Sequence, residues 1–463
     1  MSSLSREPSS FRDPSGFMFK KNNEFYRQVN FYYKDDYDRL MNSGLYEELV
    51  RNSLLVPHEE VNLLEAPEPD TAYKVIKPKK IPFISYAYEW SFEQLKDAAL
   101  LTLKIQKLAL EYGMSLKDGS SYNVQFHEGK PIFIDTLSFE KYEEGKPWVA
   151  YRQFCQHFYA PLVLMSKYDI RMNQLFRIYI DGIPLDLASK MLPWSTRLNF
   201  SILSHIHLHA KSQMKYSNKQ DVSTGTIFIS KQRLTALIDH LESSIRNLKW
   251  QQTNTEWGDY YQKTNYSDKG MKHKEQIVSD YIDRVQAKNV WDLGANIGHF
   301  SRIASNRGIS TISFDIDPAA VNQNYLLVKK NQERNLLPLL LDLTNPSSNI
   351  GWANEERKSF VERGPTDLIM ALALIHHLVI SNNVPIRSVA AFLSKLCRYL
   401  IIEFVPLHDS QVQKLLVSRK NIFDDYTQDH FEKQFGEYFD ILDSQTVADS
   451  VRTIYLMRSK IGL

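Results

Sequence analysis

Cysteine is scarce in this sequence, whose 463 residues include only Cys155 and Cys397. The two lie far apart and neither belongs to a Cys-x-x-Cys pair, which argues against a zinc site and against a disulfide-stabilised scaffold. We therefore expect two small buried apolar side chains in a reducing compartment, and no metal site.

Net charge is also nearly absent, because 56 Lys and Arg residues stand against 54 Asp and Glu residues. Without a strong positive field, we expect no nucleic-acid partner. No apolar run is long enough to span a bilayer, and the polar, proline-broken start of the chain lacks the apolar segment of a signal peptide. The sequence therefore predicts a cytoplasmic protein without a membrane partner.

What is present is a strand–helix alternation that begins near Lys274. Apolar runs of strand length alternate with segments of helical periodicity, which predicts an α/β domain with a parallel sheet and helices on both faces. Two further apolar runs near the C-terminus predict a hairpin at the sheet edge. The predicted strands are 288–292, 309–315, 336–342, 367–375, 399–404, 439–442 and 452–457.

The first half mixes strands and helices, which predicts an α+β domain over 1–215. Between the domains, 216–273 is expected to be a linker that includes an amphipathic connecting helix over 231–247, and 274–463 is the C-terminal domain. In the N-terminal half we expect a hairpin over 16–29 that turns at Lys21-Asn-Asn, a helix over 37–51, strand structure over 73–88, a helix over 91–112 and a hairpin over 122–135.

The most specific motif is the turn after the first C-terminal strand, Val290-Trp-Asp292-Leu-Gly294-Ala-Asn296-Ile-Gly298. Gly294 lets the backbone turn tightly and lets a ligand approach the main chain, and Gly298 permits close helix–strand packing. Such a turn is common to several classes of nucleotide-binding protein. The motif alone therefore indicates a nucleotide-type ligand without identifying it.

A second acid narrows the choice of ligand. Asp315 ends the next strand about twenty positions after Asp292, the spacing expected of a carboxylate that binds ribose hydroxyls. The acid at Asp292 would repel a pyrophosphate but attract an ammonium group. Asp317, two residues beyond Asp315, is expected to cap the helix that Pro318 opens.

These residues resemble motif I and the ribose-binding acid of the class I S-adenosylmethionine-dependent methyltransferases. The resemblance implies a Rossmann-like domain that binds S-adenosyl-L-methionine through Asp292, Gly294, Asn296, Gly298 and Asp315. Asn296 stands where the family usually has glycine. The resemblance also implies that Asp342, at the end of the third strand, contacts the adenine amino group, although a helix cap or a solvated loop acid is the alternative.

The fourth predicted strand ends in Ala373-Leu-Ile-His376-His377, where the family brings methyl group and acceptor together. A histidine titrates near neutral pH and can take a proton from a hydroxyl, so His376 and His377 are the catalytic candidates. Alternatively, one packs near the cofactor and the other caps the next helix. The Asn/Asp-Pro-Pro-aromatic run of exocyclic-amine methyltransferases is missing, which favours an oxygen or carbon acceptor.

An aromatic and amide-rich segment, 257–268, precedes the glycine-rich turn. Methyltransferases often have a helix here that covers the cofactor. We expect Tyr261, Asn265 and Tyr266 to cover the methionine moiety or to touch the acceptor, with a packed aromatic segment that contacts no ligand as the alternative.

The first half contains a second constellation of polar residues. Asp118 and Asn123 reproduce the Asp-x-x-x-x-Asn spacing of a kinase catalytic loop, and Asp135 follows a hairpin, where a kinase carries its metal-binding Asp. The region resembles a kinase-like or aminoglycoside-phosphotransferase-like fold. Arg27 stands where a kinase has lysine, no Gly-rich phosphate loop is visible, and the three polar residues are either Mg²⁺ ligands or turn formers.

Over its whole length the chain also resembles a family of bacterial class I methyltransferases with a long N-terminal region, some of them linked to host-specific nodulation. The runs 131–139, 151–157 and 401–406 carry this likeness. The expected function is methyl transfer from S-adenosyl-L-methionine to a small-molecule or glycan-type acceptor that the N-terminal domain selects or presents. The alternatives are a ligand- or partner-binding module without turnover, and a bifunctional protein whose kinase-like domain phosphorylates what the other domain methylates.

Overall fold

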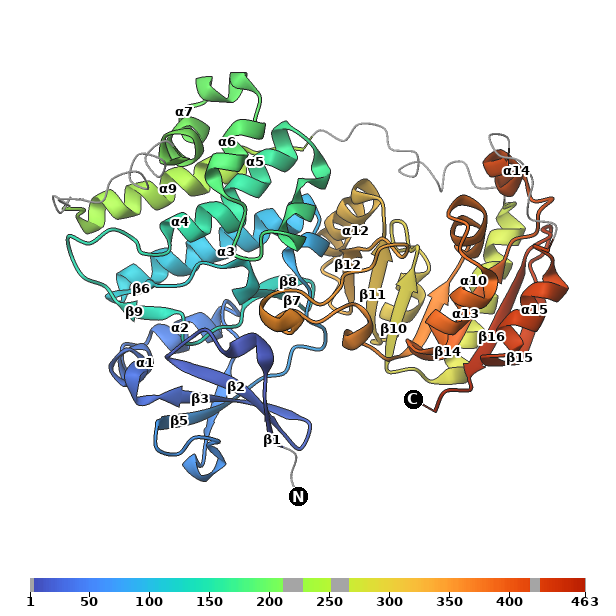
Figure 1. Ribbon diagram of the computed structural model, residues 1–463, viewed down its shortest axis with the longest axis horizontal. Helices are drawn as coiled ribbons and strands as arrows, with labels where there is room; N and C mark the ends of the chain where they lie inside the picture. The colour runs from blue at the N-terminus through green and yellow to red at the C-terminus, as the bar shows by residue number, and fades with distance from the viewer. Residues whose placement is uncertain (1–3, 211–227, 251–265, 417–424, 463) are drawn as a thin grey trace. The chain divides into compact units, whose positions relative to one another are not determined.

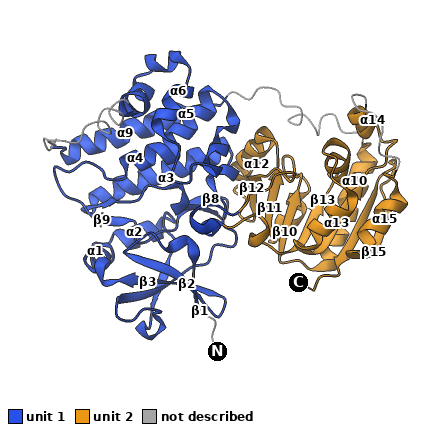
Figure 2. Ribbon diagram, in the orientation of Figure 1, with its two compact units in different colours: residues 1–251, 349–357 blue, residues 252–348, 358–463 orange. Residues whose placement is uncertain are grey.

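The protein divides into two compact units in a computed structural model that describes residues 4–210, 228–250, 266–416 and 425–462 (Figure 1). Unit 1 comprises residues 1–251 and 349–357, and unit 2 comprises residues 252–348 and 358–463 (Figure 2). Among the described residues, no helix is both long enough and apolar enough to cross a bilayer.

Unit 1 begins with an antiparallel sheet, drawn in blue in Figure 1, whose strand order is β1-β2-β3-β5-β4. The predicted hairpin is confirmed, because β2 and β3 pair across Asn22 and Asn23, which both have positive φ. The strands are β1 (Leu4–Arg6), β2 (Gly16–Lys21), β3 (Glu24–Asn30), β4 (His58–Val61) and β5 (Ala72–Pro78).

The rest of unit 1 is built around α3 (Phe92–Glu111), a helix that matches the predicted 91–112. Its capping box at Ser91 and Gln94 fixes where it begins. Two short strand pairs follow, of which β7 and β8 form the second predicted hairpin. The remaining elements are α1 (Lys34–Asn42), α2 (Leu45–Arg51), β6 (Met114–Leu116), β7 (Val124–His127), β8 (Lys130–Phe133), β9 (Phe139–Lys141), α4 (Tyr151–Phe154), α5 (Ala160–Lys167), α6 (Leu185–Met191), α7 (Phe200–Ile202) and α9 (Lys231–Asn247).

Two expectations for unit 1 were wrong in extent. The helix expected over 37–51 is two helices, because Gly44 adopts φ +85° between α1 and α2. The strand structure expected over 73–88 ends at Pro78, since prolines at 78 and 82 lack the N–H that a continuing ladder requires. The amphipathic helix over 231–247 is present as α9, which packs against α3 inside unit 1.

Unit 2 is a seven-stranded sheet with the order β12-β11-β10-β13-β14-β16-β15. Strands β10 to β14 run parallel, and β16 runs antiparallel to both of its neighbours, so the predicted parallel sheet with an edge hairpin is confirmed. The strands are β10 (Asn289–Leu293), β11 (Ser310–Asp315), β12 (Leu336–Leu340), β13 (Thr366–Ala371), β14 (Cys397–Phe404), β15 (Phe439–Thr446) and β16 (Thr453–Ser459).

Helices pack against this sheet and contribute to its core. On α10, Ile277, Val278 and Tyr281 are buried against strand residues such as Val290 and Ile401. The predicted cap is present, because Asp317 Oδ1 accepts the N–H of Ala319 at 2.8 Å at the start of α12. The helices are α10 (Asp268–Val285), α11 (Ser301–Ser305), α12 (Pro318–Asn331), α13 (Ile386–Ser394), α14 (Ser410–Leu416) and α15 (Gln428–Gly436).

The fourth strand of unit 2 is shorter than its apolar run predicted. It was expected over 367–375, but β13 ends at Ala371, and Ala373 adopts φ +50°. An apolar run marks buried backbone of any shape, so it cannot place the end of a strand. The early turn moves the residues after Ala371 from the sheet to its carboxyl edge.

Candidate functional site

A cavity of about 380 Å³ opens in unit 2 at the carboxyl ends of β10 to β13. The strand order reverses between β10 and β13, and open α/β sheets bind their ligands at such a reversal. Seven of the residues selected from the sequence line this cavity: Tyr266, Asp292, Gly294, Asn296, Asp315, Asp342 and His377. Gly298 and His376 are not among its lining residues.

Main-chain hydrogen bonds hold the turn after β10 against β11. The N–H groups of Gly294 and Ala295 both donate to the carbonyl oxygen of Phe314 at 2.9 Å. Gly294 has φ +78°, and a Cβ there would lie 3.3 Å from Leu374 Cδ1. Asn296 has φ +50°, a conformation that asparagine adopts more readily than most residues, which explains why it can replace the usual glycine.

Gly298 acts in packing rather than in lining the cavity. A Cβ at this position would lie 2.6 Å from Asn324 Nδ2 and 2.8 Å from Arg302 Nη1. The amide of Asn324 in turn donates to Ser313 Oγ at 2.9 Å. Gly298 therefore lets the turn approach α12 and β11 closely.

Asp292 and Asp315 bring two desolvated carboxyl groups to the cavity. Asp292 is 2% exposed and accepts a hydrogen bond from Ser301 Oγ at 2.6 Å, and burial raises its pKa to about 7. Asp315 accepts the N–H groups of Asn296 and Asp317 at 2.7 and 2.9 Å, one on each oxygen, and burial raises its pKa to about 6. When ionised, both groups favour a ligand that carries positive charge or hydroxyl donors.

Asp342 follows β12 at the wall of the cavity. Its Oδ1 accepts the N–H of Thr344 at 2.8 Å and the Thr344 hydroxyl at 2.6 Å. These bonds close a local turn and fix the orientation of the carboxyl group. Leu341 and Leu343 flank it and also line the cavity, which gives an acceptor oxygen within an apolar wall.

The two adjacent histidines differ in access. Their ring centroids are 4.1 Å apart, but only His377 lines the cavity, while His376 is 2% exposed. Burial and the charge of Arg452 lower the pKa of His377 to about 4, and burial also lowers the pKa of His376 well below its usual value. Both imidazoles are therefore neutral at pH 7.

A buried ionic network that the sequence did not reveal borders the cavity. Tyr266, a lining residue, donates its hydroxyl to Glu403, and Lys274 Nζ lies 2.7 Å from Glu403 Oε2. Arg452 lies 3.9 Å from Glu403 and binds Asp409 at 2.8 Å. Although burial opposes ionisation of Glu403, Lys274 and Arg452 hold its pKa below the usual value.

One signal in the sequence could have identified Lys274. It stands at the same helical spacing as Ile277, Val278 and Tyr281, all buried on one face of α10. A lysine in such an apolar stripe requires a buried partner, because an unpaired charge is costly to desolvate. Arg452 has no comparable signal, since its role depends on where β14 and β16 meet.

Tyr261 and Asn265, also selected from the sequence, lie outside the described residues. Lys274 and Phe300 line the cavity beside Tyr266, and Lys274 Nζ lies 4.9 Å from the centre of the Tyr266 ring. Of the three residues expected to cover the methionine moiety or to touch the acceptor, the structure therefore describes only Tyr266.

In unit 1 the kinase-like residues Asp118, Asn123 and Asp135 do lie near one another, but other groups of the protein already donate hydrogen bonds to Asp135. Asp135 accepts hydrogen bonds from Arg27, from Ser138 Oγ at 2.7 Å and from the N–H of Leu137 at 2.9 Å. Burial and the charge of Asp135 raise the pKa of Asp118. Among the residues described, no group of three or more His, Cys, Asp or Glu side chains is placed to hold a metal ion.

The chain is 33% identical to the nodulation protein NoeA of Rhizobium meliloti (strain 1021) over 461 residues, which cover 97% of this chain and 95% of that protein. No protein-family model matches the sequence.

Three solved structures illustrate the structural similarity, each over less than half of this chain. The bifunctional kinase-methyltransferase WbdD has 17% identity, covers 42% of this chain and 40% of its own, and has a TM-score of 0.29. The PH0226 protein from Pyrococcus horikoshii OT3 has 14% identity, covers 44% and 99%, and has a TM-score of 0.32. Magnesium protoporphyrin IX methyltransferase (ChlM) from Synechocystis PCC 6803 with bound SAH has 16% identity, covers 41% and 84%, and has a TM-score of 0.30.

Strand order and the glycine-rich turn, rather than these partial alignments, show that unit 2 is an α/β domain with a mostly parallel, Rossmann-like sheet. The similarity to NoeA extends over both units. The chain therefore belongs to the family of the nodulation protein NoeA.

Proposed function

We propose that unit 2 binds S-adenosyl-L-methionine and transfers its methyl group to an acceptor molecule. The observation that carries this proposal is the convergence of seven sequence-selected residues on one cavity at the point where the strand order reverses. These residues were selected for cofactor and acceptor chemistry and are spread from 266 to 377 along the chain, and their meeting at one cavity supports that chemistry.

The residues of the cavity fit the parts of this cofactor. Asp315, held by two main-chain N–H groups, would accept the ribose hydroxyls, and Asp342 between its two leucines would accept the adenine amino group. Asp292 and the main chain of Gly294 would hold the methionine end, where the cofactor carries an ammonium group. The cofactor would supply a methyl group on a positively charged sulfur, which an acceptor attacks in line.

His377 is the residue that we place beside the acceptor. A neutral imidazole accepts a hydrogen bond, so His377 would orient an acceptor hydroxyl. Because its pKa is about 4 rather than near neutrality, it is a weaker base than the sequence predicted and would take the proton only as the methyl group moves. Leu374, Leu378 and Leu415 also line the cavity and would exclude water there. His376, which does not reach the cavity, would hold the His377 ring in place.

The acceptor in this proposal is a small molecule or glycan that offers oxygen or carbon. The turn after β13 reads Ala373-Leu-Ile-His-His377 and lacks the Pro-Pro-aromatic sequence that positions exocyclic amines. A binding module without turnover is the competing proposal. Incubation with methyl-labelled cofactor and cell extract distinguishes them, because only an enzyme transfers the label.

Titration calorimetry with S-adenosyl-L-methionine tests the site itself. Replacing Asp315 by alanine should weaken binding about tenfold or more, which corresponds to about 1.4 kcal/mol of charge-assisted hydrogen bonding. Asp440→Asn is a matched control, because Asp440 forms an exposed pair with Arg458 on the hairpin at the sheet edge. Equal affinity of Asp315→Ala and the parent protein would remove the proposed site.

For unit 1 we propose a kinase-like arrangement that selects or presents the acceptor without transferring phosphate. The guanidinium group of Arg27 donates a hydrogen bond to Asp135 and lies 3.3 Å from Asp13. A cation of the protein itself is therefore bound to the carboxylate that would hold a metal ion in a kinase. Calorimetry of the full chain with ATP and Mg²⁺ tests this. Magnesium-dependent binding or ATP hydrolysis would favour the bifunctional alternative.

A further inference from the structure

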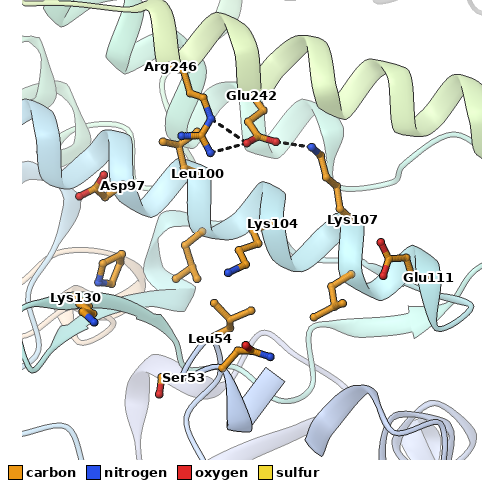
Figure 3. A pocket seen from close by; sticks show the side chains of 14 residues that line it. Ser53, Leu54, Asp97, Leu100, Lys104, Lys107, Glu111, Lys130, Glu242 and Arg246 are labelled. Atoms are coloured by element: carbon orange, nitrogen blue, oxygen red, sulfur yellow. Dashed lines mark hydrogen bonds and ion pairs between the residues drawn. The ribbon is translucent and has the colours of Figure 1, made fainter. Parts of the chain in front are cut away.

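A second, larger cavity of about 680 Å³ lies in unit 1 as a groove along α3. Its walls come from α3, the segment 52–54, the beginning of β8 and the C-terminal part of α9 (Figure 3). It is distinct from the cavity of unit 2, with which it shares no residue. The groove is lined by Asn52, Ser53, Leu54, Asp97, Leu100, Leu101, Lys104, Lys107, Leu108, Glu111, Lys130, Pro131, Glu242 and Arg246.

The lining residues of α3 form one face of that helix. From Asp97 to Glu111 they recur at intervals of three and four, which is the spacing of a single helical face. At 1.5 Å per residue the face is about 21 Å long. The two acids stand at its ends and Lys104 stands at its middle, with leucines on either side of the lysine (Figure 3).

Both walls of the groove are fixed by interactions within unit 1. On one side Lys107 and Arg246 both bind Glu242, as the dashed lines in Figure 3 show. On the other side the N–H of Phe133 donates to the carbonyl oxygen of Leu54 at 2.9 Å, which ties the segment 52–54 to β8. The groove is therefore a formed feature rather than a gap between loosely packed side chains.

Two lysines in the groove have ammonium groups without a partner. Lys104 and Lys130 are exposed, and the ammonium group of neither makes a hydrogen bond or an ion pair with any residue that the structure describes. In Figure 3 Lys104 extends from α3 toward the space above Leu54, and Lys130 lies on the β8 side. The groove's other two cations, in contrast, both pair with Glu242, and Lys107 also pairs with Asp239.

We propose that this groove binds an organic phosphate monoester that carries an apolar group. The phosphate would lie between Lys104 and Lys130, whose two positive charges balance a dianion. The apolar group would cover Leu54, Leu100 and Leu108. Asp97 and Glu111 at the two ends would repel the phosphate and so keep it in the middle of the groove.

Octyl phosphate is a suitable probe for titration calorimetry of the full-length protein, with inorganic phosphate and octyl glucoside as its anionic and its apolar half. We expect saturable binding of octyl phosphate, with each of the other two compounds about tenfold weaker or more. Saturating the unit 2 site with S-adenosylhomocysteine should leave this binding unchanged, so the outcome does not depend on the proposed methyl transfer.

The double variant Lys104→Glu, Lys130→Glu should lose about tenfold or more in affinity for octyl phosphate. Its thermal unfolding should be unchanged, because both side chains are exposed. Lys167→Glu is the matched control, an exposed lysine at the end of α5 outside the groove, and it should bind as the parent does. Parent-like binding by the double variant, equal binding of octyl glucoside, or no saturable binding of octyl phosphate would each overturn the proposal.

Discussion

The main-chain N–H of Asn296 donates to Asp315 Oδ2 at 2.7 Å, which joins the glycine-rich turn after β10 to the acid that ends β11. The second carboxylate oxygen of Asp315 accepts the N–H of Asp317. Two main-chain donors therefore orient this acid before any ligand arrives. Preorganisation of this kind lowers the cost of ordering a binding site.

Cofactor binding should strengthen as the pH rises from about 5.5 to 8. The pKa of Asp292 is raised to about 7 and that of Asp315 to about 6, so both become fully ionised only above neutral pH. A positively charged ligand is attracted only to the ionised forms. Calorimetry across this pH range, with Asp292→Asn as the variant whose pH dependence should flatten, would check it, and a pH-independent affinity would contradict it.

The same acids should lower the stability of the ligand-free protein as the pH rises. A free aspartate has a pKa of about 3.9, so between about pH 4 and 7 the folded chain binds more protons at these acids than the unfolded chain does. Their contribution to the free energy of unfolding therefore falls as pH rises through that window. Denaturant unfolding of the parent and of Asp292→Asn would show it as a smaller pH slope in the variant.

Gly298→Ala should destabilise unit 2 more than Gly308→Ala. The two glycines have nearly equal φ, +78° and +79°, so the backbone strain of an alanine in the left-handed region should be about the same in both variants. A Cβ at Gly298 would also meet Asn324 at 2.6 Å, whereas nothing lies within 4 Å of a Cβ at Gly308. Overpacking adds about 1–3 kcal/mol. Equal unfolding midpoints for the two variants would show that close packing at Gly298 is unimportant.

Removing the buried Glu403 carboxylate should cost about 3–5 kcal/mol of stability, because Lys274 would be left unpaired in the interior. Asp443→Ala supplies the comparison, since Arg284 and Asp443 form an exposed pair 3.3 Å apart that contributes about 0–1 kcal/mol. Urea unfolding of Glu403→Ala and Asp443→Ala measures the difference. Similar losses in the two variants would mean that the buried network is not stabilising.

His377→Ala should reduce methyl transfer about a hundredfold while leaving the affinity for S-adenosylhomocysteine within about threefold. The expected split follows from the proposal that His377 lies beside the acceptor, on the turn after β13, while the turn after β10 holds the cofactor. His299→Ala is a control, because His299 forms a pair with Glu275 at the surface. If His377→Ala instead weakened cofactor binding but left the methyl-transfer rate at saturating cofactor unchanged, His377 would be a cofactor-binding residue.

Local chemistry made the glycine-rich turn after β10 predictable. Gly294 and Gly298 adopt the positive φ that glycine permits, and Asp315 ends its strand as the spacing indicated. The end of the fourth strand was not predictable from its apolar run, because burial alone does not separate a strand from the turn after it. That turn decides which of His376 and His377 lines the cavity.

The sequence by itself determined the alternation of strands and helices, the turn at Gly294 and the acids Asp292 and Asp315, since each depends on neighbours within a few residues. The tertiary structure alone decided that Lys274, Glu403 and Arg452 meet in one buried network, because they come from three elements far apart in the chain. It also decided that Lys104 and Lys130 share a groove. Such partnerships depend on how elements pack, which no local pattern specifies.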